Sequence, residues 1–414
     1  MRIVVNAFGT AGDVNPFIAI ARALAALGHE PILALNPACE AAAKETGLRF
    51  VPVGPRWDVD EVAGLERYLD PNQGGINVWK EICLPNVAPT YRELGELISQ
   101  ERPDGVFAHF LCVGAQWAAR AAQVRCAIAT LAPCWWCSAE RPAIFAPQVP
   151  PRWLHRHLMW VPRIAIDFTI SKPMAPVCRE LGRPFRKDEY FRIFQEADLD
   201  LGLWSPALRP PASDDPPRSQ VVGFPFQPGA APQLDPKIGA FLESGPAPVV
   251  IGLGTSVRNL GPQFLPGVAR ACARLGRRSL LVGAELPDLP EGALAVRAAP
   301  YSAVFPRAEA IVHHGGAGTT AEALRAGKPT LIAPFASDQF DNALNAERAG
   351  VSRTLPRAKL TEASVAAALA KLLASAETKE RAARLGEVLR AEPPGAEAAA
   401  GALAAFFSSR APAY

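Results

Sequence analysis

A glycine-rich loop, HHGGAGTT at residues 313–320, combines groups that could bind a diphosphate. It follows the apolar run AEAIV and precedes a helical pattern that contains Glu322. Backbone N–H groups at the start of a helix attract anions, and the histidine and threonine side chains add further donors. The loop lacks the Gly-Lys-Ser/Thr of a Walker loop, and its glycine spacing differs from GxGxxG. Taken alone, the pattern leaves a phosphate site and an ordinary tight turn equally open.

A second loop, GTAGD at residues 9–13, follows the apolar run IVVNAF and precedes another helical pattern. Its glycines allow a ligand to approach the backbone closely. Asp13 stands where the helix should begin, and an aspartate cap typically contributes about 1 kcal/mol. The loop is therefore compatible with a structural turn and with one wall of a binding site.

These loops need a sheet to position them, and the rest of the sequence supplies the pattern for one. Apolar strand-like runs alternate with helical patterns in both halves of the 414 residues, which predicts an α/β fold with two parallel sheets. We expect an N-terminal lobe over residues 1–205, a proline-rich linker over 206–235 and a C-terminal lobe over 236–390. A final helix and tail over 391–414 could pack back on the N-terminal lobe.

The composition is typical of a globular enzyme, with a formal net charge of +3 and basic residues dispersed among acidic ones. This pattern argues against a nucleic-acid partner. The N-terminus shows neither a signal peptide nor a membrane span, so we expect a cytoplasmic protein. The eight cysteines lie mostly in apolar context and are interpreted as reduced core residues. Cys134 and Cys137 form a lone CxxC motif without the second ligand pair that zinc needs, and a redox or metal role is the lesser alternative.

Four motifs in order along the chain resemble those of family 1 glycosyltransferases. They are Gly12 to Pro16, Gly254-Thr255-Ser256, the loop at 313–320 with Glu322, and PFASDQFDNA at 334–343. The similarity is greatest to the bacterial group that includes the rhamnolipid rhamnosyltransferases, and to sterol and macrolide-type glycosyltransferases. The resemblance implies the GT-B fold, in which two doubly wound Rossmann-like lobes enclose an interdomain cleft and helices end the chain.

The resemblance also implies how a UDP- or dTDP-sugar would be held. His314 and the amides after it would bind the diphosphate, and Glu322 would bind the ribose hydroxyls. Asp338 and Gln339 would bind hydroxyls of the sugar. The implied donor-binding residues are Gly12, Thr255, Ser256, Ala298, Tyr301, His314, Gly316, Ala317, Gly318, Thr319, Glu322, Asp338 and Gln339.

One position of this implied site differs from the common family pattern, and the site is expected to need no metal cofactor. The family usually stacks an aromatic residue on the nucleotide base where this chain has Ala298, so Tyr301 or Arg297 would take over part of that contact. No metal is implied, because dipoles and donors would neutralise the leaving diphosphate. Two Asp-x-Asp triplets, at 58–60 and 198–200, are interpreted as structural.

Inverting transfer needs a base that takes the acceptor's proton as its oxygen attacks the anomeric carbon. The resemblance makes Asp13 the candidate, and it places His109 at a neighbouring strand end, with the two residue types exchanged relative to many plant members. An ordinary aspartate, with a pKa of about 3.9, is a weak base unless burial raises its pKa. We expect His109, if close, to be neutral or to act on the acceptor itself; a packed strand-end residue is the alternative.

The acceptor should bind in the N-terminal lobe, where several large aromatic residues could form an apolar wall. Each of them is singly more typical of a protein core. The candidates are Trp79, Phe110, Trp135 and Trp136. Residues 152–163 interleave Arg and His with Trp and Leu, which is compatible with a solvated helix or with a helix at a membrane surface.

The predicted function is inverting transfer of a hexose from a UDP- or dTDP-sugar. The acceptor would be a hydroxyl or carboxyl group of a small apolar molecule such as a lipid, hydroxy fatty acid, sterol or aromatic natural product. A nucleotide-sugar epimerase of the same fold and a catalytically inert transferase partner are the alternatives. A nicotinamide oxidoreductase is disfavoured because GxGxxG is absent.

Overall fold

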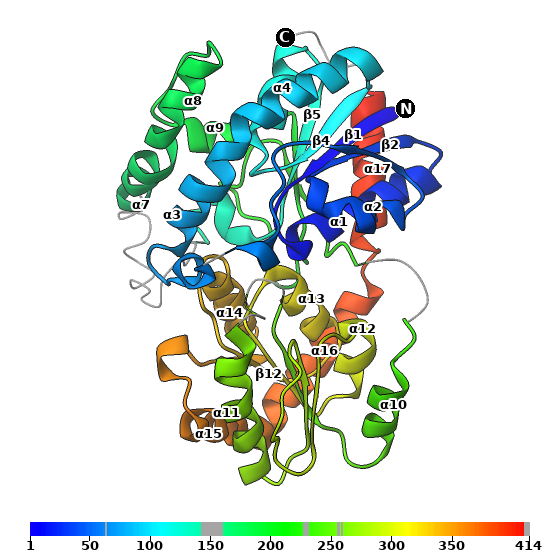
Figure 1. Ribbon diagram of the computed structural model, residues 1–414, viewed down its shortest axis with the longest axis vertical. Coiled ribbons are helices and arrows are strands. Elements are labelled where there is room, and N and C mark those ends of the chain that lie inside the picture. The colour runs from blue at the N-terminus through cyan, green and yellow to red at the C-terminus, as the bar shows by residue number, and fades with distance from the viewer. Residues whose placement is uncertain (63, 142–159, 227–231, 255–256, 258–259, 410–414) are drawn as a thin grey trace.

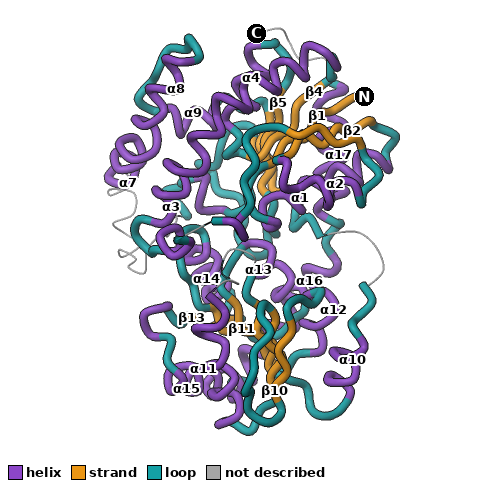
Figure 2. Tube along the Cα trace, viewed as in Figure 1, coloured by secondary structure: helices purple, strands orange, loops and turns teal. Residues whose placement is uncertain are grey.

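Two parallel sheets, one in each half of the chain, form the two lobes of this protein (Figures 1 and 2). The computed structural model describes residues 1–409 except 63, 142–159, 227–231, 255–256 and 258–259. The first sheet has the strand order β3 (Arg49–Pro52), β2 (Glu30–Leu35), β1 (Arg2–Ala7), β4 (Gly105–His109), β5 (Cys126–Thr130), β6 (Leu199–Gly202) and β7 (Ser219–Val221). The second has the order β10 (Ala293–Val296), β9 (Ser279–Val282), β8 (Val249–Gly252), β11 (Ala310–His313), β12 (Thr330–Ile332) and β13 (Ser352–Thr354).

Every pair of neighbouring strands is parallel, and helices connect most successive strands, which confirms the two doubly wound lobes. The principal helices of the first lobe are α1 (Ala11–Ala26), α2 (Glu40–Lys44), α3 (Gly74–Val78), α4 (Leu84–Glu101), α5 (Val113–Ala121), α7 (Trp160–Ile166), α8 (Ala175–Glu180) and α9 (Glu189–Gln195). Those of the second lobe are α10 (Pro236–Glu243), α11 (Gly261–Arg274), α12 (Tyr301–Val304), α13 (Ala317–Arg325), α14 (Gln339–Arg348) and α15 (Glu362–Ala374).

Strand β1 shows why continuous apolar runs form these sheets. Ile3 and Val5 belong to an apolar cluster that contains residues of α1, whereas Val4 belongs to a second cluster that contains residues of α4 and α5. Successive side chains of a strand point to opposite faces, so a sheet covered on both faces buries every residue of the strand. All three side chains are fully buried.

Strand β7 lies inside residues 206–235, which the sequence analysis assigns to a linker. It pairs in parallel with β6 and forms the edge of the first sheet. A three-residue edge strand needs ladder hydrogen bonds on one side only, so the prolines around it do not prevent pairing.

The chain returns from the second lobe to the first at its C-terminal end. Helix α16 (Ala376–Ala391) packs on α13, and α17 (Gly395–Ser408) packs on α1 (Figure 1). The start of α17 packs closely on the backbone at Phe224, because a Cβ atom at Gly395 would lie 2.4 Å from the Phe224 carbonyl oxygen. At the other end of α17, the ring of Phe407 fills the space beside Gly105. The last helix therefore fastens the second lobe to the core of the first.

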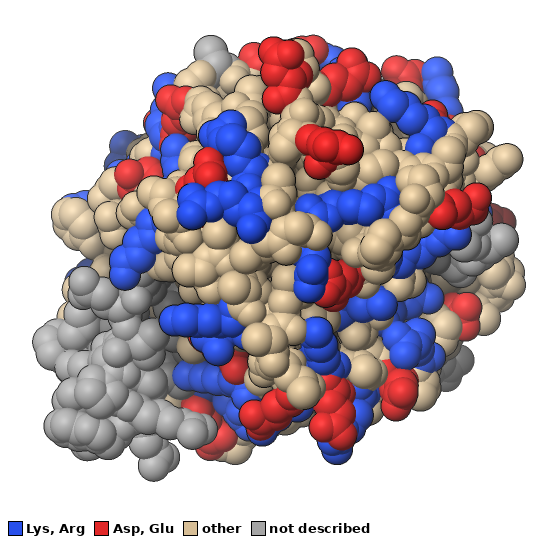
Figure 3. Space-filling view, turned by 90° about the horizontal axis from the view of Figure 1, so that it is seen from below, with Lys and Arg blue, Asp and Glu red and all other residues tan. Residues whose placement is uncertain are grey.

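The surface and the cysteines give the remaining general features. Lys and Arg side chains intermingle with Asp and Glu on the underside of the second lobe, without a single basic field (Figure 3). No described helix is long and apolar enough to cross a membrane.

None of the eight cysteines forms a disulfide. Burial raises the pKa of both Cys134 and Cys137, so this CxxC pair carries protonated thiols at neutral pH.

Candidate active site

A cavity of about 1500 Å³ lies between the lobes, where the carboxyl ends of both sheets meet. This is the position in which open α/β sheets bind ligands. The residues named from the sequence that line it are Gly12, Asp13, Trp79, His109, Phe110, Trp135, Arg297, Ala298, Tyr301, His314, Gly316, Ala317, Gly318, Thr319, Glu322, Asp338 and Gln339. Thr255 and Ser256 lie outside the described residues, and Trp136 does not line the cavity.

The β1–α1 loop holds the Asp13 carboxylate at the edge of the cavity. Asp13 is in the first turn of α1, and Thr10 is the helix cap, which corrects the expectation that Asp13 could be the cap itself. The Asp13 Oδ2 atom accepts hydrogen bonds from the Thr10 amide at 2.8 Å and from its hydroxyl at 2.9 Å. Gly9 has φ +131°, and a Cβ atom there would lie 2.4 Å from that oxygen. The loop therefore fixes one carboxylate oxygen and leaves Oδ1 free of these contacts.

His109, at the end of β4, lies beside this carboxylate and is buried. Its Nδ1 accepts a hydrogen bond from the Leu111 amide at 3.1 Å, which assigns the proton of the neutral ring to Nε2. Burial lowers the pKa of His109 to about 3, so the ring is neutral at pH 7. The Nε2 atom lies 3.9 Å from Asp13 Oδ1, beyond direct hydrogen-bond distance.

Two effects act on the charge of Asp13. Burial raises its pKa, and the hydrogen bonds from Thr10 oppose that rise. The Asp13 side chain keeps 35% of its surface exposed toward the cleft, which leaves it accessible to a ligand. A carboxylate with a raised pKa, open on one side only, has the properties of a general base.

The loop at 313–316 presents a histidine donor and the start of helix α13 to the cavity. His314 Nδ1 accepts from the Gly254 amide at 3.3 Å, and burial lowers its pKa to about 4, so its proton is on Nε2. Cβ atoms at Gly254 and Gly316 would each come within 2.4 Å of this ring. The two glycines therefore form the slot that holds His314. With the unpaired amides of α13, the loop makes an anion site.

Asp338 and Gln339 lie at the start of α14 and form another part of the second lobe's cavity wall. Burial, followed by the charge of Asp13, raises the pKa of Asp338 to about 7. The Gln339 Oε1 atom accepts from the Phe335 amide at 2.8 Å, which leaves the Nε2 group as its possible donor to a ligand. Two carboxyl groups thus face the same cavity from opposite lobes.

Asn342 is a site residue that the sequence analysis did not single out. Its Nδ2 group donates to the Gly315 carbonyl at 2.9 Å and to Asp338 Oδ2 at 3.0 Å. It therefore connects the glycine loop to the carboxyl group at the start of α14. The PFASDQFDNA motif contains this asparagine, but its spacing alone does not indicate which partners it joins.

The region expected to hold the nucleotide base and ribose contains Ala298, Tyr301 and Glu322. Tyr301 stacks on Phe305 with ring centroids 4.4 Å apart, and its hydroxyl donates to the Leu253 carbonyl at 3.1 Å. Its ring is therefore a fixed part of the wall. Burial raises the pKa of Glu322.

The first lobe contributes an aromatic wall. Trp79 donates its indole N–H to the Ile170 carbonyl at 3.0 Å, and Phe110 packs on Trp135 with centroids 5.3 Å apart. Trp57 and Phe8 also line the cavity, with their ring centroids 5.6 Å apart, and neither was predicted from the sequence. An isolated aromatic residue in a loop carries no signal that would have found them.

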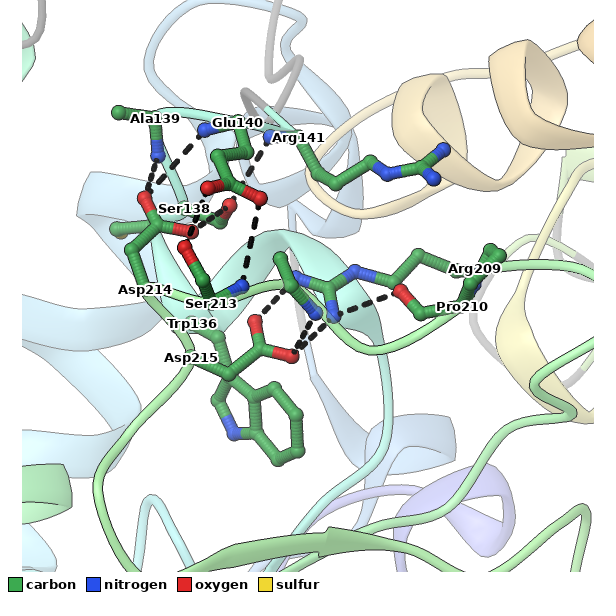
Figure 4. A network of polar contacts seen from close by, with 12 residues as sticks. Trp136, Ser138, Ala139, Glu140, Arg141, Arg209, Pro210, Ser213, Asp214 and Asp215 are labelled. Atoms are coloured by element: carbon green, nitrogen blue, oxygen red, sulfur yellow. Dashed lines mark hydrogen bonds and ion pairs between the residues drawn. The ribbon is translucent and has the colours of Figure 1, made fainter.

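The prediction that Trp136 belongs to the acceptor wall is wrong. Its indole N–H donates to the buried Asp200 carboxyl group at 2.7 Å, and its ring packs edge-on against Trp204. Beside it, Arg209 forms two hydrogen bonds with Asp215, and the neighbouring Asp214 carboxylate accepts from the Ser138 hydroxyl and the Ala139 amide in the turn after β5 (Figure 4). Trp136 therefore anchors the turn, and only its neighbour Trp135 reaches the cavity.

Comparisons with known proteins agree with this geometry. Residues 3–124 match the model of the glycosyltransferase family 28 N-terminal domain, and residues 281–405 match that of the erythromycin biosynthesis protein CIII-like C-terminal domain. The O-mycaminosyltylonolide 6-deoxyallosyltransferase of Streptomyces fradiae is 31% identical over 95% of this chain and 94% of its own length. A sterol 3-beta-glucosyltransferase of Arabidopsis thaliana is 29% identical over 82% of this chain and 57% of its own length.

A solved structure shows the same architecture. The glycosyltransferase VinC, crystallised in complex with dTDP, superposes with a TM-score of 0.70 at 22% identity, over 98% of this chain and 99% of its own. The fold is therefore GT-B. Given the relative that is 31% identical over nearly its whole length, this protein belongs to the family 1 GT-B glycosyltransferases and is a nucleotide-sugar-dependent enzyme.

Proposed function

We propose that this enzyme transfers a sugar from a dTDP- or UDP-sugar, with inversion, to the hydroxyl group of an uncharged apolar acceptor. The observation that carries the proposal is the position of Asp13. Its open carboxylate lies between an aromatic wall in the first lobe and the anion-binding loop of the second. The crystallised neighbour VinC binds dTDP, which favours dTDP over UDP here.

The proposed step follows from this placement. The acceptor oxygen attacks the anomeric carbon, the bond from that carbon to the diphosphate oxygen breaks, and the acceptor proton passes to Asp13. His109 has no free lone pair in its assigned tautomer, because Nδ1 accepts from Leu111 and Nε2 carries the proton. We therefore assign His109 to supporting the Asp13 charge and Asp13 to proton removal.

The second lobe would stabilise the leaving group. His314 Nε2–H and the first amides of α13 would take the negative charge that develops on the diphosphate. Glu322 would bind the ribose, and Asp338 with Gln339 would orient the sugar. We propose that no metal ion takes part, because these donors supply the stabilisation that a cation would otherwise give.

The acceptor is proposed to be neutral. Asp13 is the only Asp, Glu, Lys or Arg among the described first-lobe residues that line the cavity, and burial keeps His109 neutral at pH 7. An acceptor carboxylate would find no cation there and would meet Asp13 instead, so a hydroxyl is favoured over a carboxyl group. The names of the tylonolide and sterol relatives are in keeping with this class of acceptor.

A turnover assay tests the proposal. The enzyme, in excess EDTA, is incubated with dTDP-glucose or UDP-glucose and either a macrolide aglycone or a sterol, and products are followed by mass spectrometry and NMR. The proposal expects a β-linked glucoside and one nucleoside diphosphate released per transfer. Interconversion of the donor without any acceptor product, or transfer that stops in EDTA and returns with Mg²⁺, would contradict it.

A further inference from the structure

The helical segment over residues 160–172 has two sides with different surroundings. α7 continues into a π-helical turn, Asp167–Ser171, at the outer edge of the first lobe (Figure 1). Ile166 and Ile170 line the cavity, on the side of the aromatic wall. Ile164 and Phe168 precede them by two residues each, about 200° around a helix, so they face away from the cavity.

The outward side is unusually apolar for a surface helix. Ile164 is 58% exposed and Phe168 is 66% exposed, and Phe168 is the most exposed large apolar side chain of the described residues. Single exposed apolar residues are ordinary on a protein surface. Two that are four residues apart in a helix lie side by side on one face, however, and they expose a continuous patch. In water such a patch is unfavourable, so a partner that covers it would be stabilised.

Two cations flank this patch. The Lys172 ammonium lies 4.6 Å from the centroid of the Phe168 ring, and the Arg163 guanidinium lies 4.6 Å from that of Phe191. Neither cation has a carboxylate partner within ion-pair distance in the described part of the chain. Within residues 160–172, the segment that carries the patch, the sequence has two basic residues, Arg163 and Lys172, and one acidic residue, Asp167. Large apolar side chains between basic ones suit an anionic lipid headgroup layer.

We propose that Arg163, Ile164, Phe168 and Lys172, here named the docking patch, attach this enzyme to an anionic lipid surface. Because the same helix lines the acceptor side of the cavity, docking would bring that side close to the bilayer. An apolar acceptor dissolved in lipid could then enter without crossing water. Residues 152–159, for which the sequence analysis raised a membrane role, lie outside the described residues, and the proposal does not use them.

The test is co-sedimentation of the purified protein with vesicles of phosphatidylcholine containing about 30 mol% phosphatidylglycerol. Two double variants divide the patch into its parts: Ile164→Ser with Phe168→Ser, and Arg163→Gln with Lys172→Gln. Leu27→Ser is the matched control, because Leu27 is 55% exposed at the C-cap of α1, away from the patch. None of these side chains lines the cavity, so transfer to a water-soluble acceptor should stay at the wild-type rate.

We expect wild type and Leu27→Ser to bind these vesicles equally, and more weakly when salt rises from about 0.1 M to about 0.5 M. Removing the two cations should weaken partitioning by roughly 30-fold, and removing the two apolar side chains should weaken it by at least about tenfold. Absence of vesicle binding by the wild type would overturn the proposal. Binding that both double variants retain, or self-association through the patch without vesicle binding, would overturn it equally.

Discussion

Replacing Asp13 by asparagine separates the base from the structure around it. Asparagine keeps an acceptor oxygen for the amide and hydroxyl of Thr10, which are 2.8 and 2.9 Å from Asp13 Oδ2, so the start of α1 should stay intact. We expect the free energy of unfolding to change by less than about 1 kcal/mol. The group that would take the acceptor's proton is lost, however.

General base catalysis contributes about 10²- to 10⁴-fold, so kcat should fall by roughly 10³, equivalent to about 4 kcal/mol of transition-state stabilisation. The dissociation constant of dTDP should change by less than about twofold, because the anion-binding loop belongs to the second lobe. The assay is initial-rate transfer at saturating donor and acceptor, paired with calorimetric titration of dTDP.

Thr10→Ala provides the matched control. It removes the hydroxyl donor at 2.9 Å but leaves the carboxylate, so its kcat should stay within about tenfold of wild type while stability falls by about 1 kcal/mol. The reasoning would be refuted if Asp13→Asn kept more than about a tenth of wild-type kcat. Equal losses in the two variants would show that Asp13 acts only as the capping-box partner of Thr10.

Three further predictions concern the donor and acceptor sides. Because burial raises the pKa of Asp338 to about 7, the folded free enzyme holds a proton that the unfolded chain releases; stability should therefore fall as pH rises from about 4 to about 7. Chemical denaturation at several pH values should show that the free energy of unfolding falls less in Asp338→Asn than in the wild type. Gly254→Ala would place a Cβ atom 2.4 Å from the His314 ring, and it should weaken dTDP binding by at least about tenfold, measured by calorimetry. Gly239→Ala, where nothing lies within 4 Å, should leave binding unchanged. Trp135→Ala should raise KM for the acceptor several-fold in rate assays without changing dTDP affinity, and an effect confined to the donor would contradict its place in the acceptor wall.

The fold was largely predictable because each strand is buried on two faces. Runs such as Ile3-Val4-Val5 are therefore apolar throughout, and their alternation with helical patterns indicates parallel sheets. Strand β7 was missed because an edge strand of three residues is too short to show a pattern among prolines. Its position depends on β6, which lies elsewhere in the sequence.

The site residues that belong to the four motifs could be predicted from the sequence. Those whose orientation depends on long-range contacts could not. Trp135 and Trp136 are adjacent and chemically identical, yet Asp200, 64 residues away, binds the second and leaves the first in the cavity. Asn342 likewise depends on a carbonyl 27 residues away. Local sequence contains neither partner, so only the folded chain distinguishes these roles.

We infer that the loop around His314 binds a nucleoside diphosphate without a metal. Calorimetric titration of dTDP and UDP in EDTA, into wild type and His314→Ala, measures this binding. We expect the wild type to bind and the variant to bind about 10- to 100-fold more weakly, because a donor to a charged phosphate is removed. Equal binding by the two proteins, or no binding of either nucleotide to the wild type, would contradict it.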